Sequence, residues 1–207
     1  MLDNYIKLEN GVIKQDKVNV IKYDEDYVVN SYNSYGELGL RMSNLRLGYL
    51  IGSIGKVPDS ILDVGYGNGD FLKTCTSIIP NCYGNDISGY EAPNGVSFVD
   101  DITKEHYDVI TFFDVLEHFE DIDFVADLNC NYILISVPWC HYISDDWFEN
   151  WKHRRPNEHI YHFNEKSLES FMESKGFKMI NKSNIEDSIR KPADENKNVL
   201  TAIFKKQ

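Results

Sequence analysis

Three glycines stand at alternate positions of segment 63–70, which reads DVGYGNGD. The apolar run 61–64 predicts a buried strand, and a helical pattern follows the glycines. The glycines therefore occupy a strand-to-helix turn. Because glycine has no side chain, a ligand can approach the backbone of this turn closely. A dinucleotide-binding turn needs glycine where Asp70 stands, and residues 61–72 contain no Lys or Arg to neutralise a phosphate. The turn therefore predicts a cofactor that lacks phosphate and carries a positive charge for Asp63 and Asp70 to match.

Carboxylates also follow the next two predicted strands. Asp86 comes 17 residues after Gly69, at the end of run 82–87, where it could accept hydrogen bonds from both hydroxyls of a ribose. Asp101 follows run 96–99, and we expect it to accept a hydrogen bond from an adenine amino group. A solvated strand-end carboxylate and a turn cap are the respective alternatives.

The elements that must position these residues alternate between short apolar runs and helical patterns. The runs predict strands at 61–64, 82–87, 96–99, 107–113, 132–137, 177–185 and 198–204. The first five are mostly apolar, as are parallel strands covered on both faces. The gaps on either side of the third strand are too short for crossover helices, and no helix separates the last two strands, which should pair antiparallel.

Two helices and a hairpin complete the prediction. Asn164 should cap a helix that ends at Gly176 and carries Leu168, Phe171 and Met172 inward. Asn10-Gly11 predicts a two-residue turn between short N-terminal strands. A helix over 37–51 should bury Leu38, Met42, Leu45 and Tyr49, with Arg41 and Arg46 off that face.

Together these motifs resemble a class I S-adenosylmethionine-dependent methyltransferase of the broad small-molecule branch. Segment 61–69 is similar to the first motif of that family, Asp86 to its ribose-binding acid, and Asp101-Ile102 to its adenine-contacting step. Segment 113–119, which reads FDVLEHF, is similar to the stretch after its fourth strand, and residues 159–177 resemble that branch near its last helix.

We expect a single α/β domain over residues 1–207, which includes a hairpin and helix extension in 1–55 and an aromatic cap insertion in 139–163. The resemblance covers about residues 61–205 and implies the core of this domain. Its sheet should be doubly wound, Rossmann-like, seven-stranded and mostly parallel, in the order 3-2-1-4-5-7-6 with an antiparallel last hairpin. The expected cofactor is S-adenosylmethionine. The cofactor-binding residues expected on this basis are Asp63, Gly65, Tyr66, Gly67, Gly69, Asp86, Ile87, Asp101, Ile102, Phe113, Asp114 and His118. Tyr35 and Arg41 could reach the cofactor carboxylate if the N-terminal helix covers the pocket.

The acceptor pocket is expected beside residues 139–163, the aromatic cap segment. It contains all three tryptophans and four of the six histidines, and aromatic faces could stack on a planar or sugar-like acceptor, although they could equally fill the core of a small cap. We expect His141 to be the general base if the acceptor must lose a proton. The substrate-binding candidates are Trp139, Tyr142, Trp151, Arg154 and His159.

Two other features of the cap segment have competing interpretations. The basic run 152–155 could bind an acceptor phosphate or carboxylate, or pair with neighbouring acids at the surface. His159 and His162 are three residues apart, but no third ligand is evident in the sequence, so no metal is predicted.

Composition limits the kinds of binding partner and the location expected for the protein. The formal net charge is -12, which disfavours nucleic acid and anionic membranes. The longest strongly apolar stretch, 133–139, is far shorter than the ~20 residues of a membrane span, and residues 1–10 lack a signal-peptide pattern. The four cysteines form no C-x-x-C pair, so we expect free thiols in the cytoplasm. Cys140 in the sequence PWC is a weak candidate for a nucleophile of the cytosine-methylating kind.

The predicted function is methyl transfer from S-adenosylmethionine to an oxygen or nitrogen of a small metabolite. Sugar-like and phosphorylated compounds are the candidate acceptors. One alternative is another transferase or lyase that uses the same cofactor. A second is a catalytically silent module that binds the cofactor, and a nicotinamide oxidoreductase is third.

Overall fold

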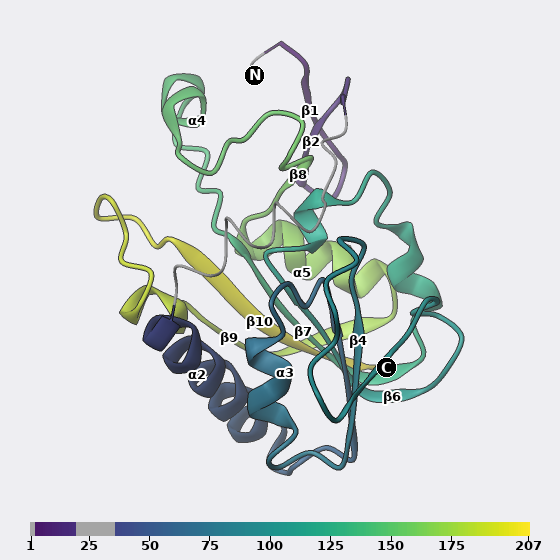
Figure 1. Cartoon of the computed structure of the whole chain (residues 1–207). Coiled ribbons are helices and arrows are strands. Elements are labelled where there is room, and N and C mark those ends of the chain that lie inside the picture. The colour runs from purple at the N-terminus through teal and green to yellow at the C-terminus, as the bar shows by residue number, and fades with distance from the viewer. Residues whose placement is uncertain (1–2, 20–35) are drawn as a thin grey trace.

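A seven-stranded sheet forms the centre of the protein, which is described here from a computed structural model over residues 3–19 and 36–207 (Figure 1). Its strands are β3 (Ser60–Val64), β4 (Asn81–Asn85), β5 (Val96–Phe98), β6 (Tyr107–Phe113), β7 (Cys130–Pro138), β9 (Phe177–Ser183) and β10 (Val199–Lys206). Their order is β5-β4-β3-β6-β7-β10-β9. β10 runs antiparallel to both of its neighbours, β7 and β9, and all the other neighbouring strands are parallel. The predicted strand order is confirmed, and no predicted strand end is displaced by more than two residues.

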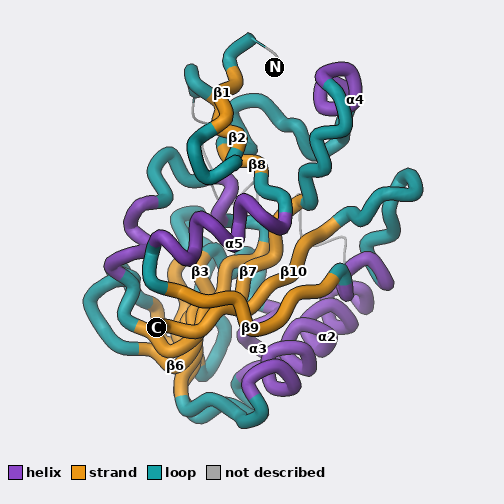
Figure 2. Tube along the Cα trace, turned by 180° about the vertical axis from the view of Figure 1, so that it is seen from behind, coloured by secondary structure: helices purple, strands orange, loops and turns teal. Residues whose placement is uncertain are grey.

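Helices cover both faces of the sheet. Figures 1 and 2 show α2 (Gly36–Ile54) and α3 (Asp70–Cys75) on one face and α5 (Glu165–Ser174) on the other. Neighbouring residues of β3 point to opposite faces: Ile61 joins the core under α2 and α3, and Leu62 joins the core under α5. The central strands are therefore apolar on both sides, as their sequences predicted.

The ends of α5 follow from local sequence. The Asn164 side chain accepts a hydrogen bond from the Ser167 backbone N–H at 2.9 Å, and the Ser167 hydroxyl accepts one from the Asn164 N–H at 2.9 Å. This capping box starts the helix. Gly176, with φ 83°, follows its last turn. Both predicted ends are confirmed.

The other connections between the strands contain loops, 3₁₀ helices or short elements. No helix lies between β4 and β5 or between β5 and β6, in agreement with the prediction. The 3₁₀ helices η1 (Leu116–His118) and η2 (Asp123–Asp127) connect β6 to β7. The cap segment contributes α4 (Asp145–Asn150) and β8 (Tyr161–His162), and η3 (Ile185–Ser188) precedes β10.

The buried face of α2 differs from the predicted one. Met42 is buried as expected, but Leu38 is 47% exposed, and the other buried residues are Ser43, Leu47 and Leu50. Apolar residues occur nearly all round this helix, so their spacing does not select one face. Arg46 was predicted to lie off the buried face. This was wrong, because its guanidinium lies 4.1 Å from the ring centroid of Phe113 in β6.

A second, three-stranded sheet lies at one end of the molecule (Figure 1). It consists of β1 (Tyr5–Lys7), β2 (Ile13–Gln15) and β8, all antiparallel. The hairpin loop spans residues 9–11, because Leu8 pairs with Val12 through a 2.8 Å hydrogen bond. The predicted two-residue turn was therefore wrong: Gly11, with φ 85°, adds the third residue of a bulged loop.

None of the helices described in residues 36–207 is both long enough and apolar enough to cross a lipid bilayer.

Candidate active site

The glycine turn adopts a conformation that side chains would prevent. Gly65, Gly67 and Gly69 have φ angles of 71°, 56° and 73°, in the left-handed region that favours glycine. A Cβ on Gly65 would lie 2.5 Å from Cγ2 of Val115, and one on Gly69 would overlap the ring of Pro93. The turn is therefore held close to the segments after β6 and β4, represented by Val115 and Pro93.

Asp86 lies directly against this turn. Its Oδ2 accepts a hydrogen bond from the Gly67 N–H at 2.8 Å, and its Oδ1 accepts one from the Ser88 N–H at 2.8 Å. The next side chain, Ile87, is 78% exposed. The fold thus places the predicted ribose acid beside the glycines, followed by an apolar side chain with a free surface.

Asp63 places a buried carboxylate at the end of β3. Its side chain accepts a 2.6 Å hydrogen bond from the Thr111 hydroxyl, and the residue is only 3% exposed. Burial raises the Asp63 pKa to about 7, against the opposing effects of Thr111 and the more distant Arg46. A cation bound nearby would favour the ionised form. Asp70 differs, because Lys73 already pairs with it at 3.2 Å.

The other predicted contacts near the turn have structural partners. Asp101 is exposed, and its Oδ1 accepts hydrogen bonds from the Thr103 N–H and hydroxyl at 3.0 and 2.7 Å, so it caps a turn. Ile102 packs against the core on the α5 side. The Tyr66 ring is buried against Gly84, and its hydroxyl donates to the Tyr90 carbonyl.

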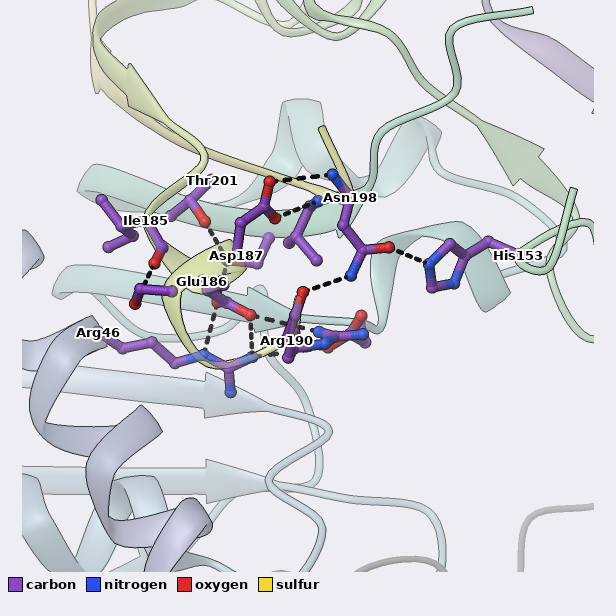
Figure 3. A network of polar contacts seen from close by, with 12 residues as sticks. Arg46, His153, Ile185, Glu186, Asp187, Arg190, Asn198 and Thr201 are labelled. Atoms are coloured by element: carbon purple, nitrogen blue, oxygen red, sulfur yellow. Dashed lines mark hydrogen bonds and ion pairs between the residues drawn. The ribbon is translucent and has the colours of Figure 1, made fainter. Parts of the chain in front are cut away.

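A partly buried ion-pair network, centred on the fully buried Glu186, lies at the same edge of the sheet (Figure 3). Arg46 makes a bidentate contact with Glu186, with distances of 2.8 and 3.0 Å. Arg190 bonds Asp114 at 2.6 Å and approaches Glu186 at 3.3 Å, and Ser136 donates to Glu186 at 2.7 Å. The two guanidinium groups hold the Asp114 pKa well below its usual range, although burial opposes them.

Most of this network was not predicted from the sequence. Asp114 was expected near the cofactor, and Phe113, also expected there, lies beneath the Arg46 guanidinium. Glu186 and Arg190 were not considered. Their opposite charges at i,i+4 spacing between the last two strands were the available signal. Arg41 is exposed on α2, and Tyr35 lies outside the described residues.

A second polar cluster follows directly after Val115. His118 and His159 meet edge to face with ring centroids 4.7 Å apart, and His118 Nε2 lies 3.9 Å from Oε1 of Glu117. Burial lowers the pKa of both histidines, that of His159 to about 2, so both are neutral near pH 7. Burial raises the Glu117 pKa well above its usual value.

The predicted acceptor residues divide into two groups. Trp139 and His141 stack with centroids 5.7 Å apart, Lys197 Nζ lies 4.7 Å from the Trp139 ring, and His141 Nε2 lies 2.9 Å from the Lys197 carbonyl oxygen. The other candidates surround Tyr5 and Phe148. Tyr142 and Trp151 pack on Phe148, and the Arg154 guanidinium lies over the Tyr5 ring.

The remaining cap-segment candidates have structural roles. The basic run 152–155 is divided, because Arg155 pairs with Glu158 at 2.8 Å and the buried His153 lies 2.8 Å from Oδ1 of Asn198. Cys140 is a buried free thiol, and burial raises its pKa to about 12, which does not suit a nucleophile.

Comparison with known families identifies the chain. A family model described as a methyltransferase domain matches residues 40–182, which include the glycine turn, Asp86, η1 and the cap segment. The chain belongs to this methyltransferase family. The motifs and the fold make it a class I S-adenosylmethionine-dependent methyltransferase. The comparison with curated proteins finds no match.

Solved structures share the fold of this methyltransferase at low sequence identity. The magnesium protoporphyrin IX methyltransferase of Synechocystis, with bound S-adenosylhomocysteine, is 16% identical with a TM-score of 0.58, over 82% of this chain and 84% of that one. The 1,6-didemethyltoxoflavin N1-methyltransferase of Burkholderia thailandensis, with bound 1,6-didemethyltoxoflavin and S-adenosylhomocysteine, is 14% identical with a TM-score of 0.59, over 99% of both chains.

The residues of the methyltransferase fit S-adenosylmethionine. The cofactor carries a positive sulfonium and an ammonium group, a ribose and no phosphate. The buried Asp63 carboxylate suits a cationic group, and Asp86 lies where its oxygens can also accept from ribose hydroxyls. The left-handed glycines keep Cβ atoms out of the turn between these two acids.

Proposed function

We propose that the enzyme methylates an oxygen or nitrogen of a small metabolite at the carboxyl edge of its main sheet. The supporting observation is a continuous chain of contacts. Val115 packs on Gly65 of the cofactor turn, and the residues that follow it lead to His118, which contacts His159 of the cap segment. A methyl donor over the turn would therefore face groups from η1 and the cap segment.

The cofactor would be held by backbone and acidic groups. We assign the glycine turn, Asp63, Asp86 and Ile87 to it, and we keep the backbone of Tyr66 together with Asp101, Ile102, Phe113 and Asp114 as further candidates. Arg46 is a better candidate than Arg41 for the cofactor carboxylate, because it faces the sheet above Phe113 whereas Arg41 is exposed. When bound, S-adenosylmethionine supplies an electrophilic methyl group on sulfur.

The acceptor would lie on the Trp139 and His141 side of the cap segment. Trp139 is buried beneath His141 and Lys197 and would form the floor of this site, where Lys197 adds positive charge. Tyr142, Trp151 and Arg154 would shape this pocket from the small core around Tyr5 and Phe148. Holding acceptor and methyl group in line accounts for much of the rate acceleration expected of such an enzyme.

His141 would accept the proton that an acceptor hydroxyl or ammonium loses. Its Nε2 donates to the Lys197 carbonyl, since a carbonyl oxygen can only accept, and Nδ1 therefore keeps its lone pair in the neutral ring. His141→Gln should lower kcat by roughly 10²- to 10⁴-fold with little change in KM. His106→Gln, which changes an exposed histidine before β6, should match the wild type.

Product analysis tests the reaction class. The enzyme is incubated with S-adenosylmethionine and a panel of hydroxylated and amino acceptors, and the nucleoside product is identified by mass spectrometry. S-Adenosylhomocysteine together with an acceptor heavier by one methylene group supports the proposal. Methylthioadenosine would indicate aminocarboxypropyl transfer, and cofactor binding without turnover on any acceptor would indicate a silent binding module. Either result would contradict it.

A further inference from the structure

One group of three metal-ligating side chains occurs among the described residues. It consists of Glu117 and His118 of η1 and His159 of the cap segment, whose ligand atoms all lie within 4.8 Å of one another. The sequence showed no third ligand for His159, because the fold brings together residues 41 positions apart. We propose that these three side chains bind a divalent metal ion beside the cofactor turn.

Glu117 is the strongest reason for the proposal. The residue is 1% exposed, and no other residue in 3–19 or 36–207 hydrogen-bonds either carboxylate oxygen. The nearest imidazole nitrogen, Nε2 of His118, lies beyond hydrogen-bond distance at 3.9 Å. Burying a carboxylate that has no hydrogen-bond or ion-pair partner costs folding free energy. A cation held between Glu117 and the two imidazoles would satisfy it.

The two histidines are oriented as metal ligands usually are. His159 Nδ1 lies 2.8 Å from the His153 carbonyl oxygen, so it donates its N–H there and leaves the lone pair on Nε2. His118 likewise hydrogen-bonds the backbone of Glu158. A ring nitrogen bonded to a backbone carbonyl fixes the tautomer and the direction of the other nitrogen, which is a common outer-shell arrangement at metal centres.

The ligand set indicates the class of metal. Two imidazoles and one carboxylate suit Zn²⁺, Mn²⁺, Fe²⁺ or Co²⁺ better than Ca²⁺, which prefers oxygen ligands alone. Three protein ligands leave at least one coordination position for another oxygen. The His118 side chain is 16% exposed, so one side of the cluster reaches the surface of the described structure.

The position of the cluster suggests the role of the ion, and this step rests on the proposed function. His118 follows three residues after Val115, which packs on the cofactor turn. A metal ion there could bind an acceptor hydroxyl and lower its pKa, so that the hydroxyl loses its proton more readily before methyl transfer. The acceptor atom would then be an oxygen. His118 would serve the metal and not the cofactor.

Metal titration of the full chain tests the site without cofactor or acceptor. Protein stripped with a chelator is titrated with Zn²⁺ and Mn²⁺ by calorimetry and with Co²⁺ by visible absorption. We expect one equivalent to bind, with d–d bands of a histidine-ligated Co²⁺ ion. Glu117→Gln and His159→Gln should each weaken binding by at least about tenfold. His106→Gln, an exposed histidine before β6, should bind like the wild type.

A control for correct folding separates the loss of a metal ligand from unfolding of the variant. Glu117→Gln preserves the shape of the side chain, and circular dichroism should show an unchanged spectrum. Metal should raise the Tm of the wild type and of His106→Gln but not that of Glu117→Gln. Absence of stoichiometric binding, or equal binding by the wild type and a folded Glu117→Gln, would overturn the metal site. Neither result would bear on methyl transfer itself, which the product analysis tests separately.

Discussion

Gly65 is the residue at which the glycine turn packs against Val115, just before η1. It has a left-handed φ of 71°, and Val115 occupies the space that a side chain would need. The same contact connects the turn to η1, which begins at the next residue. A side chain here would either push η1 away or distort the turn.

Gly65→Ala should therefore destabilise the protein by more than backbone strain alone, which costs about 1 to 3 kcal/mol for a left-handed non-glycine residue. Urea denaturation measures the free energy of unfolding. The matched control is Gly89→Ala, because Gly89 has φ 79° but nothing within 4 Å of its added Cβ. Equal costs for the two variants would show that the Val115 contact does not constrain the turn.

The proximity of the glycine turn and Asp86 could be predicted because its signals are local. The glycine spacing and Asp86 at a strand end are visible within 30 residues of sequence, and the fold brings them together. Arg46 and Glu186 are 140 positions apart, and the residues between them do not indicate that they meet. The Glu117 cluster was missed for the same reason.

At the scale of elements, His162 of β8 belongs to the small core between the N-terminal hairpin and the cap segment. Its ring contacts Phe148, Tyr5 and Trp151 at centroid distances of 5.0, 5.7 and 5.8 Å. Burial, assisted by Arg154, lowers its pKa to about 3. The ring is thus neutral in the folded protein but takes up a proton in the unfolded chain below pH ~6.5.

Lowering the pH should therefore reduce the free energy of unfolding of the wild type more than that of His162→Phe. The unfolded wild type binds one more proton at this position below pH ~6.5, so its relative stability should fall by about 1.4 kcal/mol per pH unit, or about 2 kcal/mol between pH 7 and pH 5. Denaturation at both pH values measures the difference. The stability of the control variant His106→Gln should show the same pH dependence as that of the wild type. Parallel pH dependences for the wild type and His162→Phe would mean that His162 is not buried as a neutral ring.

Elements differ in how far sequence specifies them. β6 was predicted to the residue because a run that is apolar on both faces can only be a buried strand or a short buried helix, and its length favours the strand. Helix α2 was predicted, but its buried face was not. Because apolar residues surround this helix, tertiary packing determines which face is buried, and Arg46 packs against Phe113.

At the scale of the whole molecule, the buried ion pairs join parts of the chain that are distant in sequence. Glu186 of η3 bonds Arg46 of α2 and Ser136 of β7. Asn198, just before β10, donates from Nδ2 to the Arg190 carbonyl and lies 2.8 Å from the His153 ring in the cap segment. One network therefore connects the N-terminal helix, the sheet edge and the cap segment.

Arg46→Met should cost roughly 3 kcal/mol of unfolding free energy, because it leaves the buried Glu186 carboxylate with fewer partners. Glu186→Gln and the double variant complete a double-mutant cycle, measured by urea denaturation. The cycle should give a coupling energy of about 1 to 3 kcal/mol between the two side chains. Additive losses would mean that the bidentate pair does not act as a unit.

Calorimetry of cofactor binding tests most directly whether the turn at Gly65–Gly69 is built for a thioether nucleoside. The full chain is titrated with S-adenosylhomocysteine and, in parallel, with NAD. We expect saturable binding of S-adenosylhomocysteine, a roughly 10- to 100-fold weaker Kd in Asp86→Ala, and no heat with NAD. Binding of NAD, or equal affinity of the wild type and Asp86→Ala for S-adenosylhomocysteine, would contradict this assignment.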